Sequence, residues 1–172
     1  MCSRGWSTQG PWNAAPFKSV VNVSSRLIEV DEVVSFAGLD SNTPFLGSGW
    51  SPEQNFAWTT GTESKLEFQL PSLPSSELEF QVSFAPLLHL TYLPNRTISV
   101  FIGETKCASW TVSSTDWQTR TFGLPPGLEG KQVQIVLHQS DARSPREMGF
   151  GDDPRSLGVA VGSLRLAKRH HQ

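Results

Sequence analysis

Four side chains suited to binding a sugar lie within one short segment: Trp50, Glu53, Asn55 and Trp58. The exposed face of an indole stacks on the apolar face of a pyranose ring, and carboxylate and amide groups hydrogen-bond its hydroxyls. Buried, the same tryptophans would supply contact area to the core, which is the more common fate of any single tryptophan. The group predicts a saccharide site in a turn-like segment, with a structural role as the alternative.

Residues for catalysis are sparse. A nucleophile needs a base within hydrogen-bonding reach, and the four histidines are scattered. His89 and His138 fall in apolar or strand-like runs that favour a core position, and the other two, His170 and His171, belong to the predicted tail. Glycoside hydrolysis needs only two carboxylates, and those in loop-like contexts are Glu53, Glu147, Asp152 and Asp153. Because loop carboxylates are usually solvated, we expect no catalytic residue and no enzyme, with hydrolysis as a disfavoured alternative.

An acidic turn is the best candidate for a metal site. Asp152 and Asp153, with Glu147, could hold calcium, which prefers clustered oxygen ligands. The turn lacks the alternating spacing of a dedicated calcium loop, so we favour a solvated turn or a carboxylate that pairs with Arg155. The sequence also lacks a glycine-rich phosphate loop, a paired cysteine motif and a His-Glu-Xaa-Xaa-His motif. We therefore predict no metal and no cofactor.

Charge and hydropathy exclude two classes of partner. The formal net charge is -2 and the isoelectric point is near 6.1, so phosphate backbones and anionic lipids are not attracted. The sequence has no apolar run long enough to span a bilayer. We expect neither nucleic acid nor a membrane as partner.

Compartment and thiol chemistry follow from a few positions. Met1–Gly10 lacks the apolar stretch of an export signal, so a cytoplasmic location is expected. The two cysteines, Cys2 and Cys107, are too few for a disulfide framework and are interpreted as free thiols. The glycosylation patterns at Asn22 and Asn95 are then chance matches, because such sites matter only in exported chains.

Short strands recur along the chain. Apolar and polar residues alternate most clearly at 65–70 and 77–84, which is the pattern of half-buried strands. Pro71–Ser76 separates these two strands, because proline cannot donate to a ladder. Further strands bounded by turn residues are predicted at 97–102, 106–112, 117–122, 131–139 and 157–166, with weaker candidates at 19–23, 26–30 and 33–36.

The pattern predicts one all-β domain, an antiparallel two-sheet sandwich of jelly-roll type. Helical periodicity is nearly absent, and no linker or internal repeat divides the chain. We expect an irregular lead-in at 1–17, the β-sandwich at 18–167 and a disordered basic tail at 168–172.

Two motifs resemble a known family. Gly49–Glu53 (GWSPE) followed by Phe56–Gly61 (FAWTTG), and Ser144–Glu147 (SPRE) followed by Asp153–Val161 (DPRSLGVAV), resemble β-sandwich modules joined to glycosyltransferase domains of bacterial polysaccharide synthesis. The resemblance covers residues 36–166. Such modules are similar to carbohydrate-binding domains, so it implies an accessory, noncatalytic role in contact with a saccharide or polysaccharide.

The resemblance adds a partner and a fifth site residue. It implies an attached or associated glycosyltransferase domain and a role in surface polysaccharide synthesis or glycosyl transfer. Arg155 would bind an acidic sugar or position Glu53, and we predict that Arg155 lies beside Glu53 and Trp50. The alternative function is a structural or docking sandwich that mediates contacts between proteins or subunits.

Overall fold

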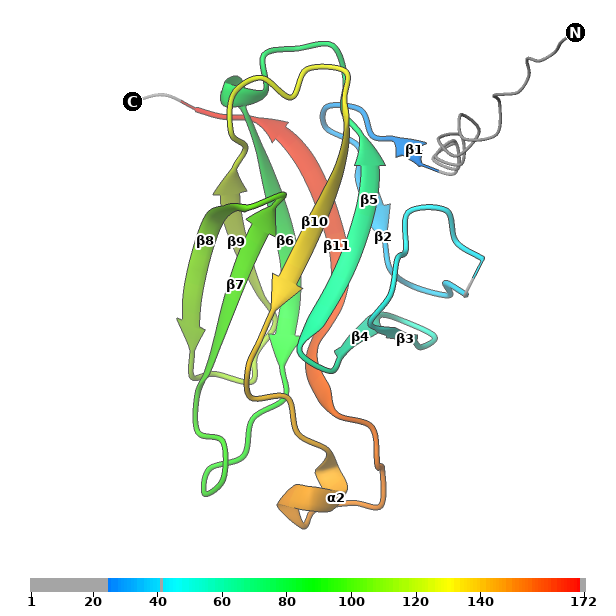
Figure 1. Cartoon of the computed structure of the whole chain (residues 1–172). Helices are drawn as coiled ribbons and strands as arrows, with labels where there is room; N and C mark the ends of the chain where they lie inside the picture. Colours follow the sequence, from blue (N-terminus) through cyan, green and yellow to red (C-terminus); the bar gives the residue numbers. More distant parts are fainter. Residues whose placement is uncertain (1–24, 41, 171–172) are drawn as a thin grey trace, which may run out of the picture.

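The computed structural model describes residues 25–40 and 42–170 (Figure 1). The strands are β1 (Arg26–Leu27), β2 (Val33–Ser35), β3 (Trp50–Pro52), β4 (Ala57–Thr60), β5 (Glu63–Gln69), β6 (Leu78–Pro86), β7 (Arg96–Ile102), β8 (Thr105–Val112), β9 (Gln118–Gly123), β10 (Gln132–His138) and β11 (Leu157–Lys168). The helices are the 3-10 turn η3 (Ser75–Glu77) and the short α2 (Pro145–Met148).

Two sheets form the layers of a sandwich (Figure 1). Sheet A has the strand order β1-β5-β10-β7-β8, and sheet B has the order β3-β4-β11-β6-β9, with β2 also paired to β11. The pairing is antiparallel except between β1 and β5, which are parallel. The predicted all-β sandwich is confirmed, with this single parallel pair as the departure from it.

The core lies between the sheets because strand side chains alternate in direction. On β6 the alternate residues Leu78, Phe80, Val82 and Phe84 are buried, while those between them are partly exposed. Ring centroids of Phe80 lie 6.5 Å from Phe68 on sheet A and 5.4 Å from Phe122 on sheet B. Phe80 therefore packs against side chains of both layers.

The clearest sequence patterns locate β5 and β6 to within two residues, and Pro71–Ser76 forms the predicted connection, ending in η3. The predicted strand at 26–30 is shorter, ending at Leu27. Strand β11 continues to Lys168, so the boundary predicted at 167 falls inside a strand. The lead-in at 1–17, the candidate strand at 19–23, and Cys2, Asn22 and His171 lie outside the described residues.

A buried arginine joins the two sheets at the end of the sandwich that carries α2, which we call the α2 end (Figure 1). The Arg96 side chain, at the start of β7, is fully buried. Its Nη1 donates to the Leu157 carbonyl of β11 at 3.1 Å, and its Nε lies 3.4 Å from Asp141 Oδ1. Burial lowers the pKa of Arg96 to about 10, and the Asp141 charge opposes that shift. Arg96 therefore depends on Asp141 for compensation of its charge.

Within the part of the chain that the structure describes, no helix is both long and apolar enough to cross a membrane.

Candidate functional site

The predicted turn-like segment is a tight hairpin formed by β3 and β4. Ser51 pairs with Trp58, and Trp50 pairs with Thr59. Glu53 N donates to the Phe56 carbonyl at 2.8 Å, which leaves Gln54 and Asn55 exposed at the tip. The sequence pattern missed these strands because each has only three or four residues and β3 ends in a proline.

The two tryptophans of this hairpin point to opposite sides of sheet B. Thr59 is fully buried, and its partner Trp50 packs against core residue Phe36 with ring centroids 5.4 Å apart. The Trp50 Nε1–H donates to the Lys65 carbonyl at 2.8 Å. Successive side chains along a strand point to opposite faces of the sheet, so Trp50 lies on the face opposite to that of Ser51 and its partner Trp58. The expectation that Trp50 and Trp58 would face one sugar is therefore corrected. The geometry of Trp50 matches the structural alternative.

Trp58 belongs to a group of rings that pack edge-to-face on the outer face of sheet B. We call Phe56, Trp58 and Trp117 the aromatic platform. The Phe56 ring centroid lies 5.4 Å from that of Trp58 and 6.2 Å from that of Trp117. Trp117, which immediately precedes β9, is 53% exposed. The platform therefore presents an accessible indole, the surface that stacking on a sugar requires.

Small residues of β11 make room for the platform. Ala160 pairs with Trp58 and is only 3% exposed, although it lies on the outer face of the sheet. A Cβ added to Gly162 would meet Trp117 Cζ3 at 3.0 Å, which is tighter than ordinary packing. A larger residue at Gly162 would push against the Trp117 ring, so β11 helps to determine where that ring lies.

Polar groups beside the platform converge on Arg155. We call Ser51, Glu53, Asp153 and Arg155 the Arg155 cluster. The Arg155 Nη1–H groups donate to Ser51 Oγ at 2.6 Å and to Glu53 Oε1 at 2.9 Å. Its Nη2 donates to Asp153 Oδ2 at 2.7 Å. The predicted pairing of Arg155 with Glu53 is confirmed, and β11 lies beside the early strands β2 and β4 as that prediction required.

The cluster perturbs the charges of its own members. Hydrogen bonds from Arg155 lower the pKa of the Asp153 carboxyl from 3.8 to about 2. Asp153 and then Glu53 raise the pKa of Arg155 further above its already high value. Asp153 and Arg155 are therefore ionised at neutral pH.

We expect Asp153 to contribute to acid sensitivity. Because its pKa is lower in the folded chain than in the unfolded chain, the stabilisation is complete above about pH 4 and is lost as the pH falls towards about 2. Urea denaturation between those limits should show a smaller decline in the Asp153→Asn variant than in the wild type. Equal declines in both proteins would contradict this assignment.

The other carboxylates considered for catalysis or metal binding do not form such a site. Glu147 forms a capping box with Ser144 at the start of α2, and the backbone and side-chain hydrogen bonds from Ser144 lower its pKa. Among the described residues no group of three or more possible ligands could hold a metal ion. A glycosidic general acid needs a raised pKa, whereas those of Asp153 and Glu147 are lowered. These two carboxylates do not suit that role.

The histidines and the described cysteine lie elsewhere. His89 and His138 were expected in the core but are only partly buried. His89 stacks on Phe150 at 5.3 Å between centroids at the α2 end, and His138 contacts the edge of Phe101 at 6.4 Å on sheet A. Cys107 has no disulfide partner among the described residues, and burial raises the pKa of its thiol.

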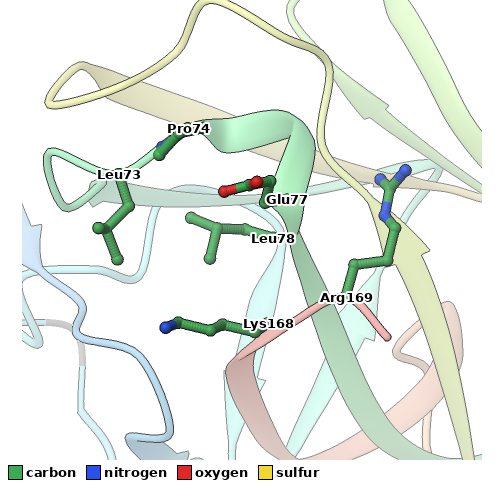
Figure 2. A pocket seen from close by; sticks show the side chains of 6 residues that line it. All are labelled: Leu73, Pro74, Glu77, Leu78, Lys168 and Arg169. Carbon is green, nitrogen blue, oxygen red and sulfur yellow. The ribbon is translucent and has the colours of Figure 1, made fainter. Parts of the chain in front are cut away.

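A hollow of about 290 Å³ lies near the C-terminal end of β11, away from the platform (Figure 2). Its lining residues are Leu73, Pro74, Glu77, Leu78, Lys168 and Arg169, none of them aromatic. Figure 2 shows the Lys168 amino group and the Arg169 guanidinium pointing in different directions. The hollow therefore lacks the ring that a sugar would stack on, which the aromatic platform provides.

The comparisons with known proteins concern the fold. No family model matches the sequence, and no curated protein matches it significantly. Among solved structures, the chain is similar to the CBM36-1 domain of a multidomain xylanase from the hindgut metagenome of Trinervitermes trinervoides. The TM-score is 0.50 at 10% identity, over 81% of this chain and 98% of that domain. The chain therefore shares the two-sheet β-sandwich architecture of that domain.

Two larger proteins contain a similar sandwich. One is the mosquito-larvicidal Cry4Aa toxin of Bacillus thuringiensis, with a TM-score of 0.54 at 9% identity over 85% of this chain and 25% of the toxin. The other is an acetyl xylan esterase from Butyrivibrio proteoclasticus, with a TM-score of 0.50 at 6% identity over 83% of this chain and 35% of the esterase. At these identities the similarity establishes architecture only.

Proposed function

We propose that the chain is a noncatalytic carbohydrate-binding module that holds a saccharide on the outer face of sheet B. The exposed indole of Trp117 carries the proposal. It packs edge-to-face against Phe56, which in turn packs edge-to-face against Trp58, and its exposed indole gives a pyranose ring an apolar surface to stack on. Glu53 and Asn55, on the same hairpin, supply acceptors and donors for hydroxyl groups.

The fold supports a binding role, and the two sequence motifs support a more specific ligand and partner. The similarity to the carbohydrate-binding module of a xylanase is consistent with a binding role. The motifs at 49–61 and 144–161 support a finer proposal, in which the ligand is a surface polysaccharide during synthesis and the partner is a glycosyltransferase. Arg155 joins the two motifs through Ser51 and Glu53, which gives the pattern a physical basis.

A glycan array tests the proposal. Labelled protein should bind a subset of the array, and the bound saccharides should change tryptophan fluorescence in solution, because Trp58 and Trp117 lie at the proposed site. A folded protein that binds no glycan at millimolar concentration would exclude carbohydrate recognition. Pull-down with a glycosyltransferase, with and without its saccharide product, separately tests the finer proposal.

Exposed apolar residues at the α2 end favour a second candidate, a docking role. Leu90 is 94% exposed, Tyr92 57% and Phe150 46%. Clusters of this kind often mark protein contacts. If this surface mediates self-association, sedimentation velocity should show a larger species for the wild type that the Leu90→Ser variant loses. Saccharide binding should be the same in both proteins, because Leu90 lies outside the platform.

A further inference from the structure

Nearly all the N–H groups of Arg155, in the binding site proposed above, already donate hydrogen bonds to neighbouring side chains. A guanidinium has five N–H groups. The Arg155 Nε–H is shared between the two oxygens of Asp153, at 3.0 and 3.1 Å. Nη1 donates to Ser51 and Glu53, and Nη2 to Asp153. Within the described residues only one Nη2 hydrogen is left, too few for the two parallel bonds by which arginine normally holds a carboxylate.

The cluster also has the wrong charge for an acidic ligand. One guanidinium faces two carboxylates, so the formal charge of the three side chains is negative. Arg146 of α2 adds a further positive charge, but it affects the pKa of Asp153 less than Arg155 does. The side chains of Arg155 and Glu53 are 39% and 37% exposed, so their charges reach the surface.

The negative charges lie next to the stacking surface. Ser51, which accepts from Arg155, is the cross-strand partner of Trp58. Glu53 closes the hairpin against Phe56. A sugar stacked on the platform would therefore lie beside Glu53, while the N–H groups of Arg155 are largely engaged within the cluster.

We infer that the platform selects neutral and amino sugars and rejects uronic and sulfated sugars, with Arg155 acting as a positioning residue for Glu53. This inference rests on the proposed function. Glu53 uses Oε1 to accept from Arg155, and its remaining lone pairs accept hydrogen bonds from hydroxyl or ammonium groups. An acidic sugar would bring like charge to Glu53 and Asp153, which opposes binding.

The experiment compares matched saccharides on the wild type and on a charge-neutralised variant. Array members that share a linkage and differ only in carrying glucose, glucosamine or glucuronic acid are titrated by tryptophan fluorescence. We expect the wild type to bind the neutral and amino forms about tenfold or more tightly than the acidic form, a difference of roughly 1.4 kcal/mol. The variant Glu53→Gln/Asp153→Asn removes both negative charges beside Arg155, and its discrimination against glucuronic acid should shrink or reverse.

The matched control is Glu67→Gln/Glu104→Gln, which changes net charge equally but alters sheet A. It should keep the wild-type preference. Added salt should also reduce discrimination in the wild type, because it screens exposed charges, and this measurement needs no substitution. Tighter binding of acidic forms by the wild type, or an unchanged preference in the neutralised variant, would overturn the inference while leaving carbohydrate binding intact. Absence of binding to any array member would instead overturn the proposed function.

Discussion

The Asp141→Asn substitution is expected to destabilise the fold by about 3 kcal/mol, at the low end of the roughly 3–5 kcal/mol for removing one partner of a buried ion pair. The Arg96 guanidinium is fully buried and would lose its compensating charge, whereas the Asp141 side chain is 31% exposed. Two carbonyls, of Leu157 and Asp141, would still accept from Arg96. Urea denaturation at neutral pH measures the change in the free energy of unfolding.

A double-mutant cycle separates this ion pair from local damage to the loop. Arg96→Met removes the guanidinium and is itself expected to destabilise the fold, because the Leu157 carbonyl loses this donor. In the Arg96→Met background, Asp141→Asn should have little effect, because no buried charge is left to compensate. Equal destabilisation in both backgrounds would show that Asp141 acts through the loop and not through Arg96.

The Trp117→Ala substitution is expected to remove most of the saccharide affinity while leaving the fold intact. Truncating a central aromatic contact typically costs about 2 kcal/mol or more, which is roughly a thirtyfold loss of affinity. Stability should change little, because Trp117 is 53% exposed and covers only the outer face of sheet B. Titration with the saccharide that binds best on the array gives the affinity, and thermal denaturation confirms the fold.

Tyr92→Ala is the matched control for this experiment. Tyr92 is 57% exposed, similar to Trp117, but it lies in the β6–β7 loop at the α2 end. Its removal should leave affinity unchanged. If Trp117→Ala bound saccharide as the wild type does, or if Tyr92→Ala lost affinity equally, the platform would not be the binding surface.

The alternation of apolar and polar residues was enough to predict the sandwich. It identified β5 and β6, where one face of each strand is buried and the other is not. It could not locate β3 and β4, because two short strands in a hairpin give too few repeats to distinguish them from a turn. The parallel pairing of β1 is likewise a property of the topology, which local patterns do not encode.

The candidate site was only partly predictable for a related reason. The motif resemblance brought Arg155 to Glu53, and the structure confirms that contact. Trp50 was assigned to the same face as Trp58 because the segment was interpreted as a turn and not as a strand. Trp117, one of the tryptophans at predicted strand ends, was left out of the predicted site because its contact with Phe56 depends on the pairing of β9, β6 and β11, which no nearby residue signals.

The position of β11 in the sheet has a consequence for the order in which the protein folds. β11 follows every other described strand in the sequence, yet it pairs with β2, β4 and β6. While the ribosome is still synthesising the chain, these earlier strands lack their shared neighbour, and sheet B cannot close until β11 has left the exit tunnel. Ala160 and Gly162, which lie next to Trp58 and Trp117, belong to that same strand. The face that we propose as the binding surface would therefore be among the last parts of this sandwich to form on the ribosome.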